Sequence, residues 1–299
     1  MAYSQSLQKQ MINKLKKILQ RHSSKEWIRL FDIKYGLGAL ENLFASNWFN
    51  PFGTLYLNLR SFPLMQAFKM PVFVYGRPHF YSLSGKMIVK GKVTPGMIRF
   101  NQTKPAAPSH MGLQSEINNR GTICFHGKGF IGTGNKIFVG FNKILSLGNL
   151  FKITDMCNIS CYSGISIGAQ SWVVHRCQIL DSNFHFIANF SQKTIPQYSM
   201  PITIGKGCWI CNSTTVTGGA VIPDYTIVAS NSLVNKNFSN LPANSLIGGI
   251  PAAFIKNGIC RVDNKNKIKK IFDFYKQNKD ALFSIPSNDS PDLYSRINS

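Results

Sequence analysis

Acidic residues are scarce in this 299-residue chain, which has 12 Asp and Glu against 34 Lys and Arg and therefore a formal net charge of +22. A positive net charge of this size attracts phosphates, nucleic acid and anionic membrane surfaces, but it says little about the fold. Charged residues make up only 15% of the chain, whereas 44% of it is hydrophobic and 22 residues are Phe. The chain is too apolar to be intrinsically disordered.

Long apolar runs are also missing. Lys14, Lys16 and Lys17 interrupt the N-terminal stretch, so it does not resemble a signal peptide. Residues 62–75 contain Lys69 and two prolines and are not expected to span a membrane. The seven cysteines fit no closed disulfide framework, because their number is odd, and we expect reduced thiols. These features predict a cytoplasmic protein, with peripheral contact at the inner face of the membrane as an open alternative.

The pattern along the chain predicts four parts. Residues 1–50 form a basic helical segment, which either packs on the body or lies on an anionic membrane. Residues 51–120 read as short irregular strands followed by an excursion loop, and residues 121–256 form the main β domain. Residues 257–299 contain a basic helix and a tail.

The main β domain contains an internal repeat with a period of six residues. Aliphatic residues occupy every sixth position without a miss, at Ile204, Ile210, Val216, Ile222, Val228 and Val234. Two positions before each of them the residue is small in five cases of six, namely Cys208, Thr214, Ala220, Thr226 and Ser232. An earlier block repeats the pattern at Ile167, Val173 and Ile179, with Ile153, Ile159 and Ile165 upstream in a shifted frame.

A period of six fits neither a helix, whose period is 3.6, nor an alternating strand, whose period is 2. It does fit a chain that turns a corner after each short strand, with three sides to a coil. Each side then places one aliphatic residue in a triangular core, and the small residue fits where the corner leaves no room. Stacked coils pair as parallel strands and bury a continuous core that no single coil could bury.

This repeat resembles the hexapeptide-repeat acyltransferases, which fold as a left-handed parallel β-helix. The resemblance covers residues 121–256, and it includes the segments Ile204–Ile210 and Gly248–Lys256, which are similar to signatures of the sugar and antibiotic O-acetyltransferases. One departure is Cys211, where the family usually has Gly. The resemblance implies a mainly β, left-handed β-helix with helical segments at both ends, assembled as a C3 trimer with active sites between subunits.

The repeat stops at Asp181 and resumes at Ile202, so residues 186–201 must leave the β-helix as a loop, and loops on a rigid solenoid often carry sites. In the family a His at such a break is the general base, which implies this role for His185. A pKa near 6.5 leaves an imidazole largely neutral and able to accept a proton. Asp181 either orients that imidazole or contacts the acceptor, or it caps a corner of the coil.

The resemblance also implies a tryptophan in the wall of the active site, Trp209, for which core packing is the alternative. It implies acetyl-CoA as the acyl donor, lying along the later coils. Glycines allow a ligand to approach the backbone, and lysines can meet phosphate charge. The implied contacts are Gly218, Gly219, Ala229, Ser230, Asn235, Lys236, Pro251 and Lys256.

Other chemistry is weakly indicated. The pair Cys208 and Cys211 has metal-ligand spacing, but Cys208 falls on the small-residue position, so we expect a packed thiol. The related γ-class carbonic anhydrases bind zinc through three His; here only His175 and His185 lie close in the repeat, so we expect no metal site. The basic clusters lack an aromatic RNA-binding pattern, and we expect no nucleic-acid partner.

The sequence thus predicts an acetyl-CoA-dependent O-acyltransferase that acetylates a sugar hydroxyl in a surface polysaccharide or its precursor by direct transfer. An N-acetyltransferase acting on an amino sugar is the nearest alternative. From another class, a non-catalytic β-helix could serve as a binding module that docks on an anionic membrane. Retention of His185, Trp209 and the closing Gly-Ile-Pro-Ala segment together favours the enzyme.

Overall fold

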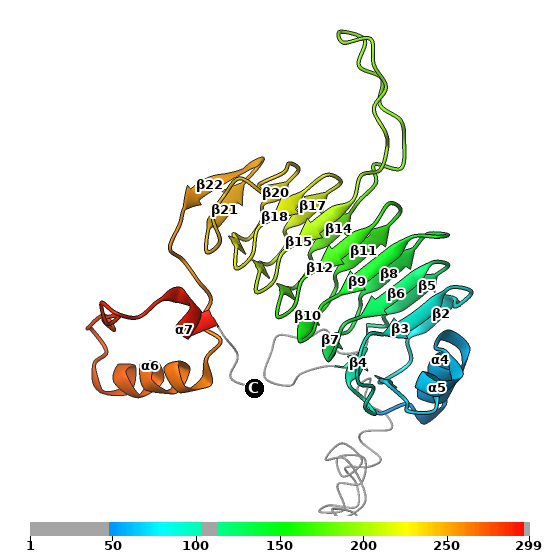
Figure 1. Ribbon diagram of the computed structural model, residues 1–299, viewed down its shortest axis with the longest axis horizontal. Helices are drawn as coiled ribbons and strands as arrows, with labels where there is room; N and C mark the ends of the chain where they lie inside the picture. The colour runs from blue at the N-terminus through cyan, green and yellow to red at the C-terminus, as the bar shows by residue number, and fades with distance from the viewer. Residues whose placement is uncertain (1–47, 103–112, 296–299) are drawn as a thin grey trace, which may run out of the picture.

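The structure, a computed structural model, describes residues 48–102 and 113–295 as a three-sided prism of parallel strands with helices at each end (Figure 1). The predicted N-terminal helices lie outside the described residues. Each side of the prism is one sheet, and the chain visits the three sheets in turn. This is the left-handed parallel β-helix that the six-residue repeat predicts.

The strand bounds follow the three sheets. The nine-stranded sheet contains β1 (Val72–Val74), β4 (Ile98–Phe100), β7 (Gly129–Ile131), β10 (Phe151–Ile153), β13 (Trp172–Val173), β16 (Trp209–Ile210), β19 (Ile227–Val228), β21 (Leu246–Gly249) and β22 (Ala252–Lys256). The seven-stranded sheet contains β2 (His79–Ser82), β5 (Glu116–Asn119), β8 (Lys136–Val139), β11 (Asn158–Cys161), β14 (Gln178–Leu180), β17 (Thr215–Thr217) and β20 (Leu233–Val234). The six-stranded sheet contains β3 (Lys86–Val89), β6 (Thr122–Phe125), β9 (Ile144–Leu147), β12 (Ile165–Ile167), β15 (Ile202–Ile204) and β18 (Val221–Ile222).

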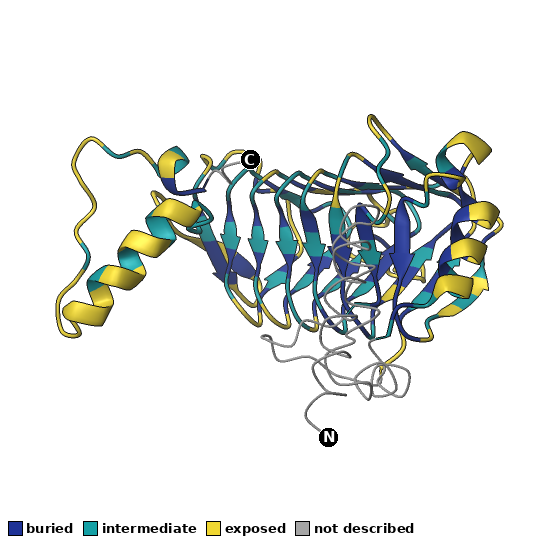
Figure 2. Cartoon of the chain, turned by 90° about the horizontal axis from the view of Figure 1, so that it is seen from below, coloured by how far each residue is buried: buried dark blue, intermediate teal, exposed yellow. Residues whose placement is uncertain are grey.

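The repeat positions lie where the predicted geometry requires. Successive members of the aliphatic series fall on successive sheets, and each is at most 1% exposed. In the seven-stranded sheet the series aligns across coils, because Ile179 pairs with Val216 and Val216 with Val234. The small residues Cys208, Thr214 and Ala220 are fully buried at the corners. Figure 2 shows the resulting alternation of buried and partly exposed residues along the strands.

The β-helix begins earlier than the predicted boundary at residue 121. Strand β1 pairs with β4 and β4 with β7, and β3 pairs with β6, so residues 72–125 belong to the same three sheets. The strict repeat is not visible there because Phe100 and Met87 fill the core alongside aliphatic residues. Short strands at 72–75 and 86–89 are confirmed as β1 and β3.

The expectation of strands directly after Asn50 was wrong, because this segment forms the helices α4 (Pro51–Ser61) and α5 (Leu64–Ala67). Asn50 caps α4 by accepting a hydrogen bond from the Gly53 N–H at 2.7 Å, and a proline suits the first helical position. Asn58 then bonds both the N–H and the C=O of Val72. Helix α4 therefore provides hydrogen-bond partners for β1, the edge strand of the nine-stranded sheet, whose backbone groups would otherwise be unpaired.

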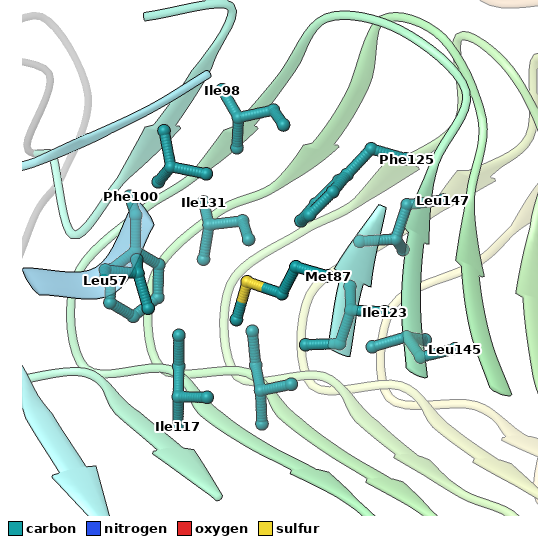
Figure 3. Close-up of a pocket in the computed structure, with 12 residues that line it drawn as sticks. Leu57, Met87, Ile98, Phe100, Ile117, Ile123, Phe125, Ile131, Leu145 and Leu147 are labelled. Atoms are coloured by element: carbon teal, nitrogen blue, oxygen red, sulfur yellow. The ribbon is translucent and has the colours of Figure 1, made fainter. Parts of the chain in front are cut away.

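The interior of the first coils is wholly apolar. Figure 3 shows side chains from α4 and all three sheets converging around Met87, with a cavity of about 10 Å³ between them. The residues lining it are hydrophobic, so this cavity offers no polar group to orient a ligand. It is part of the core and carries no chemistry.

At the other end, β22 folds back antiparallel onto β21, and the chain continues into α6 (Lys265–Gln277) and α7 (Pro291–Ser295). The predicted C-terminal helix is confirmed as α6, which has no buried residue and stands off the prism (Figure 2). Its peripheral contact with a membrane stays a prediction. Among the described residues, no helix combines the length and the apolar character needed to cross a bilayer.

The core series provides a matched test of the fold. Ile159 of β11 is fully buried, whereas Ile144 of β9 is 55% exposed on the outer surface of the prism. We expect Ile159→Ala to lower the free energy of unfolding by about 2–5 kcal/mol, because it removes core volume, and Ile144→Ala to lower it by less than about 1 kcal/mol. Urea unfolding followed by circular dichroism measures both. Equal losses would contradict the inward assignment of the repeat.

Candidate active site on the interrupted coil

The predicted loop is the largest departure from the prism. It leaves after β14 and returns at β15, and in Figure 1 it projects far from the coils. Its two arms run antiparallel, with bridges between Ser182 and Ser199 and between Asn189 and Thr194. The loop is therefore an ordered hairpin that starts at one edge of the prism, between the seven-stranded and six-stranded sheets. We call this edge the loop edge; on it lie residues 162–164, 181–201, 218–220 and 235–237.

His185 lies near the base of this hairpin and is exposed. The backbone before it is held by a hydrogen bond from the Asn183 N–H to the Tyr198 carbonyl at 2.8 Å and by one from the Phe184 N–H to Ser182 Oγ at 3.0 Å. The ring of Phe184 meets that of Tyr162 edge-on, with centroids 5.2 Å apart. The imidazole thus stands on a fixed base and is open to a substrate.

Asp181 caps a corner of the coil, which is one of the three roles that the sequence leaves open. Its carboxylate is fully buried and accepts hydrogen bonds from the N–H groups of Tyr162 at 2.7 Å, Ser163 at 2.8 Å and Gly164 at 2.7 Å. These contacts tie the carboxylate to the corner, and an additional role toward the imidazole or the acceptor stays a prediction. Asp181 joins the start of the hairpin to the coil below it. Burial, and then this carboxylate, raise the pKa of the neighbouring Cys161 thiol to about 12.

Trp209 lies far round the prism from His185. It is on β16 of the nine-stranded sheet, which is the side opposite the loop edge. It pairs in register with Trp172 of β13, and Ile210 beside it fills the core while the indole faces outward. The described residues provide no acceptor for the buried Nε1–H of Trp209. A single chain therefore does not bring Trp209 and His185 together.

Trp172 is a residue that sequence reasoning missed. Arg261 covers its ring, with the guanidinium carbon 4.2 Å from the ring centroid, and donates hydrogen bonds to the carbonyls of Gln170 and Cys208. Aligning the repeat would have found it, since Trp172 precedes Val173 as Trp209 precedes Ile210. The C-terminal segment is thereby fastened beside the two tryptophans.

The implied coenzyme contacts fall into two groups. Gly218, Gly219, Asn235 and Lys236 lie on the loop edge, on the two coils that follow His185. A Cβ on Gly218 would stand 2.9 Å from the Asp181 carbonyl oxygen, which shows how closely this corner packs against the base of the hairpin.

The second group lies on the edge between the nine-stranded and seven-stranded sheets, which we call the second edge. Ala229 and Ser230 follow β19 there, and the Ala229 N–H donates to the Ile247 carbonyl at 2.9 Å. Pro251 follows β21 on the same edge. Lys256 stands apart from both groups, because β22 runs antiparallel and Lys256 pairs with Leu246 at the start of β21, at the opposite edge of the nine-stranded sheet. Lys236 and Lys256 are exposed, so both ammonium groups can reach a phosphate. A single chain therefore does not bring the implied coenzyme contacts together at one edge.

The cysteine pair is packed as expected. Cys208 is fully buried and donates a hydrogen bond to the Pro223 carbonyl at 3.0 Å, and burial raises its pKa to about 12. Burial also raises the pKa of Cys211 to about 11. Thiols of this kind are poor nucleophiles, because the thiolate is the reactive form. Within the part of the chain that the structure describes, His, Cys, Asp and Glu form no group suited to hold a metal ion.

The cap role of Asp181 makes a specific prediction. Asp181→Ala leaves three backbone N–H groups without their carboxylate, so we expect a loss of about 3 kcal/mol in the free energy of unfolding. Asp224 is the control, because its 43% exposed side chain accepts a single backbone hydrogen bond, from the Lys206 N–H, and Asp224→Ala should cost less than about 1 kcal/mol. Denaturant unfolding measures both. If Asp181→Ala kept its full stability but lost its turnover, the result would instead support a role of Asp181 in the reaction, toward the imidazole or the acceptor.

Two curated proteins are similar to this chain over about half of its length, and no family model matches it. An uncharacterized 24.8 kDa protein from the cps region of Klebsiella pneumoniae is 38% identical over 143 residues, which are 48% of this chain and 62% of that protein. The proposed lipopolysaccharide biosynthesis O-acetyl transferase WbbJ of Escherichia coli K12 is 26% identical over 148 residues, which are 47% of this chain and 74% of that protein.

Solved structures with similarity include the polySia specific acetyltransferase NeuO, at 20% identity and a TM-score of 0.39, covering 63% of this chain and 79% of that one. The polysialic acid O-acetyltransferase OatWY has 17% identity and a TM-score of 0.32, with coverage of 68% and 85%. The fold itself is established by the strand pairing described above. In its repeat and its three-sided β-helix, the chain is similar to the hexapeptide-repeat acetyltransferases.

Proposed function

We propose that the protein is an acetyl-CoA-dependent O-acetyltransferase that acts on a hydroxyl of a surface polysaccharide or its precursor. The observation that carries this proposal is the position of His185. The imidazole is exposed at the foot of an ordered hairpin, on a coil directly below the glycines for which the family resemblance implies coenzyme contact. The name of the Escherichia coli relative, which links it to O-acetyl transfer in lipopolysaccharide biosynthesis, agrees with this chemistry.

His185 acts as the general base in this proposal. The imidazole takes the proton of the acceptor hydroxyl, and the oxygen attacks the carbonyl carbon of the thioester. The new C–O bond forms, the C–S bond breaks, and the proton on the imidazolium passes to the departing thiolate to give free coenzyme A. Direct transfer is favoured because the nearby Cys161 is 0% exposed and its high pKa makes it a poor covalent nucleophile.

The donor site is proposed to lie between two chains. The loop-edge group of one chain, with Gly218 and Lys236, would face the second-edge group of its neighbour, with Ala229 and Pro251. The same arrangement would bring Trp209 of one subunit toward His185 of another, which a single chain keeps on opposite sides. A C3 trimer provides three such sites, because every subunit offers each edge once.

An amino-sugar N-acetyltransferase is the enzymatic alternative, and a non-catalytic platform is the alternative of another class. The exposed imidazole favours catalysis over a platform, since a platform has no need of a base there. Release of free coenzyme A thiol, measured with acetyl-CoA against matched hydroxyl and amine acceptors, separates the three. Thiol release with hydroxyl acceptors alone supports the proposal.

The proposed base is tested by His185→Ala. We expect kcat to fall by about 10²–10⁴-fold, because a positioned base is lost, while the melting temperature stays close to that of the parent, since the side chain is exposed. His126 is the matched control: it is exposed after β6, at the edge between the six-stranded and nine-stranded sheets, which the proposed shared site does not use, and His126→Ala should keep its turnover. Steady-state kinetics and thermal melts measure these effects. Near-normal turnover of His185→Ala would overturn the assignment.

The assembly is tested separately. The hairpin exposes several large apolar side chains to solvent, which a neighbouring subunit would cover: Phe184, Phe186, Ile187, Phe190 and Ile195. We expect a trimer in sedimentation equilibrium, and we expect Phe190→Asp, at the 90% exposed tip position, to shift the population toward monomer and to lower turnover with it. Phe272→Asp on α6 is the control and should leave the trimer intact. A stable and fully active monomer would contradict the shared site.

A further inference from the structure

The outer face of the seven-stranded sheet carries a hollow of about 320 Å³ on the coils below His185. This volume is in the range of ligand pockets. We call it the sheet groove, and it is lined by Tyr81, Glu116, Asn118, Lys136, Ile137, Phe138, Asn158, Ser160 and Tyr162. These residues come from β2, β5, β8 and β11 and from the corner that follows β11. None of them belongs to the implied catalytic or coenzyme set.

We propose that the sheet groove binds several consecutive sugars of a polymeric acceptor and leads its hydroxyl to His185. This inference rests on the proposed function and extends it from a sugar in general to an oligosaccharide chain. The four strands that form the groove span about 14 Å at the usual spacing between paired strands, which is longer than a single sugar ring.

The chemistry of the lining suits a sugar chain. Phe138 and Tyr162 stack with centroids 4.5 Å apart, and Tyr81 at the far end is 63% exposed. Such rings can pack against the C–H faces of pyranoses. Asn118 on β5 lies beside Phe138, and Asn158 on β11 lies beside Lys136. An amide can donate to one hydroxyl and accept from its neighbour. Among the described residues, none gives Asn118 Oδ1 a hydrogen bond, so that amide is not locked into the protein.

The charge of the groove argues against a nucleotide-linked sugar. The chain has a net charge of +22, yet Lys136 is the single cation among the lining residues, and it pairs with Glu116 at 3.7 Å. A diphosphate would need several unpaired cations or an array of N–H groups. A face that is nearly neutral within a strongly basic protein therefore fits the hydroxyl-rich body of a glycan.

The groove is also connected to the proposed base. Tyr162 forms its upper end and touches both Phe138 below and Phe184, the residue that precedes His185. The Tyr162 N–H is held by the Asp181 carboxylate at 2.7 Å. The end of the groove and the foot of the hairpin are thus one hydrogen-bonded unit. An acceptor lying on β2 to β11 would approach His185 from below, while the donor contacts lie on the coils above it.

Binding and transfer are measured separately to test the groove. The full chain is applied to an array of capsular and lipopolysaccharide O-chain oligosaccharides that contain one to six sugars. For glycans that bind, we expect the affinity to rise about tenfold between one sugar and three or four, and then to level off. In Tyr81→Ala and in Asn158→Ala, the ratio of the affinity for three or four sugars to the affinity for one sugar should fall toward one. Phe272→Ala, an equally exposed aromatic position on α6, is the control and should keep the gain.

The outcomes distinguish this inference from the proposed function. Length-dependent binding that Tyr81→Ala abolishes supports the groove, even if no acetyl transfer is detected, in which case only the enzymatic proposal fails. Acetyl transfer to glycans with a length gain that neither variant changes overturns the groove and leaves the enzyme standing. Absence of any gain with length overturns it as well. Dissociation of the assembly by Tyr81→Ala in sedimentation would make this face a subunit contact and would also overturn the proposal.

Discussion

The register between stacked coils is the constraint on which the rest of this structure depends. Each side of the prism is only two to five residues of strand, and its one or two inward side chains are buried because a coil lies above and below them. A strand that slipped by one residue would turn these side chains outward. Additional residues can therefore enter only at the corners, and the hairpin that carries His185 does so.

An insertion at a corner interrupts the hydrogen bonding between stacked coils. The buried carboxylate of Asp181 replaces the hydrogen-bond acceptors that are missing there. Three N–H groups of the corner below would otherwise be left beneath the hairpin, and one carboxylate accepts hydrogen bonds from all of them. This explains how a long loop can leave the β-helix without loosening the coils on either side. The hydrogen bond between the Tyr162 N–H and the Asp181 carboxylate also fixes Tyr162 relative to the start of the hairpin. It therefore helps to determine the position of the exposed His185 imidazole.

The sequence predicts the later coils well because one aliphatic residue per side leaves a strict trace, from Ile204 to Val234. The early coils do not show this six-residue pattern of aliphatic residues, because large side chains such as Phe100 also fill their core. Helix α4 was missed for a related reason: its outward face is also apolar, with Phe52 81% exposed, so no amphipathic pattern marks it. The hairpin could be located from the break in the repeat. Sequence reasoning named the corner cap among the roles of Asp181 but not its partners, because these lie on the preceding coil.

The order of features along the prism axis bears on how such an enzyme could work. The sheet groove occupies coils before the hairpin, and Gly218 and Lys236 occupy coils after it, so the proposed acceptor and donor sites share one edge without overlapping. Both substrates could then be bound at once, as direct transfer requires, and neither would have to leave before the other entered. His185 lies between the proposed acceptor site on the earlier coils and the proposed donor site on the later coils. Under this proposal the protein separates two binding tasks by distance along its axis and joins them at the hairpin that carries His185.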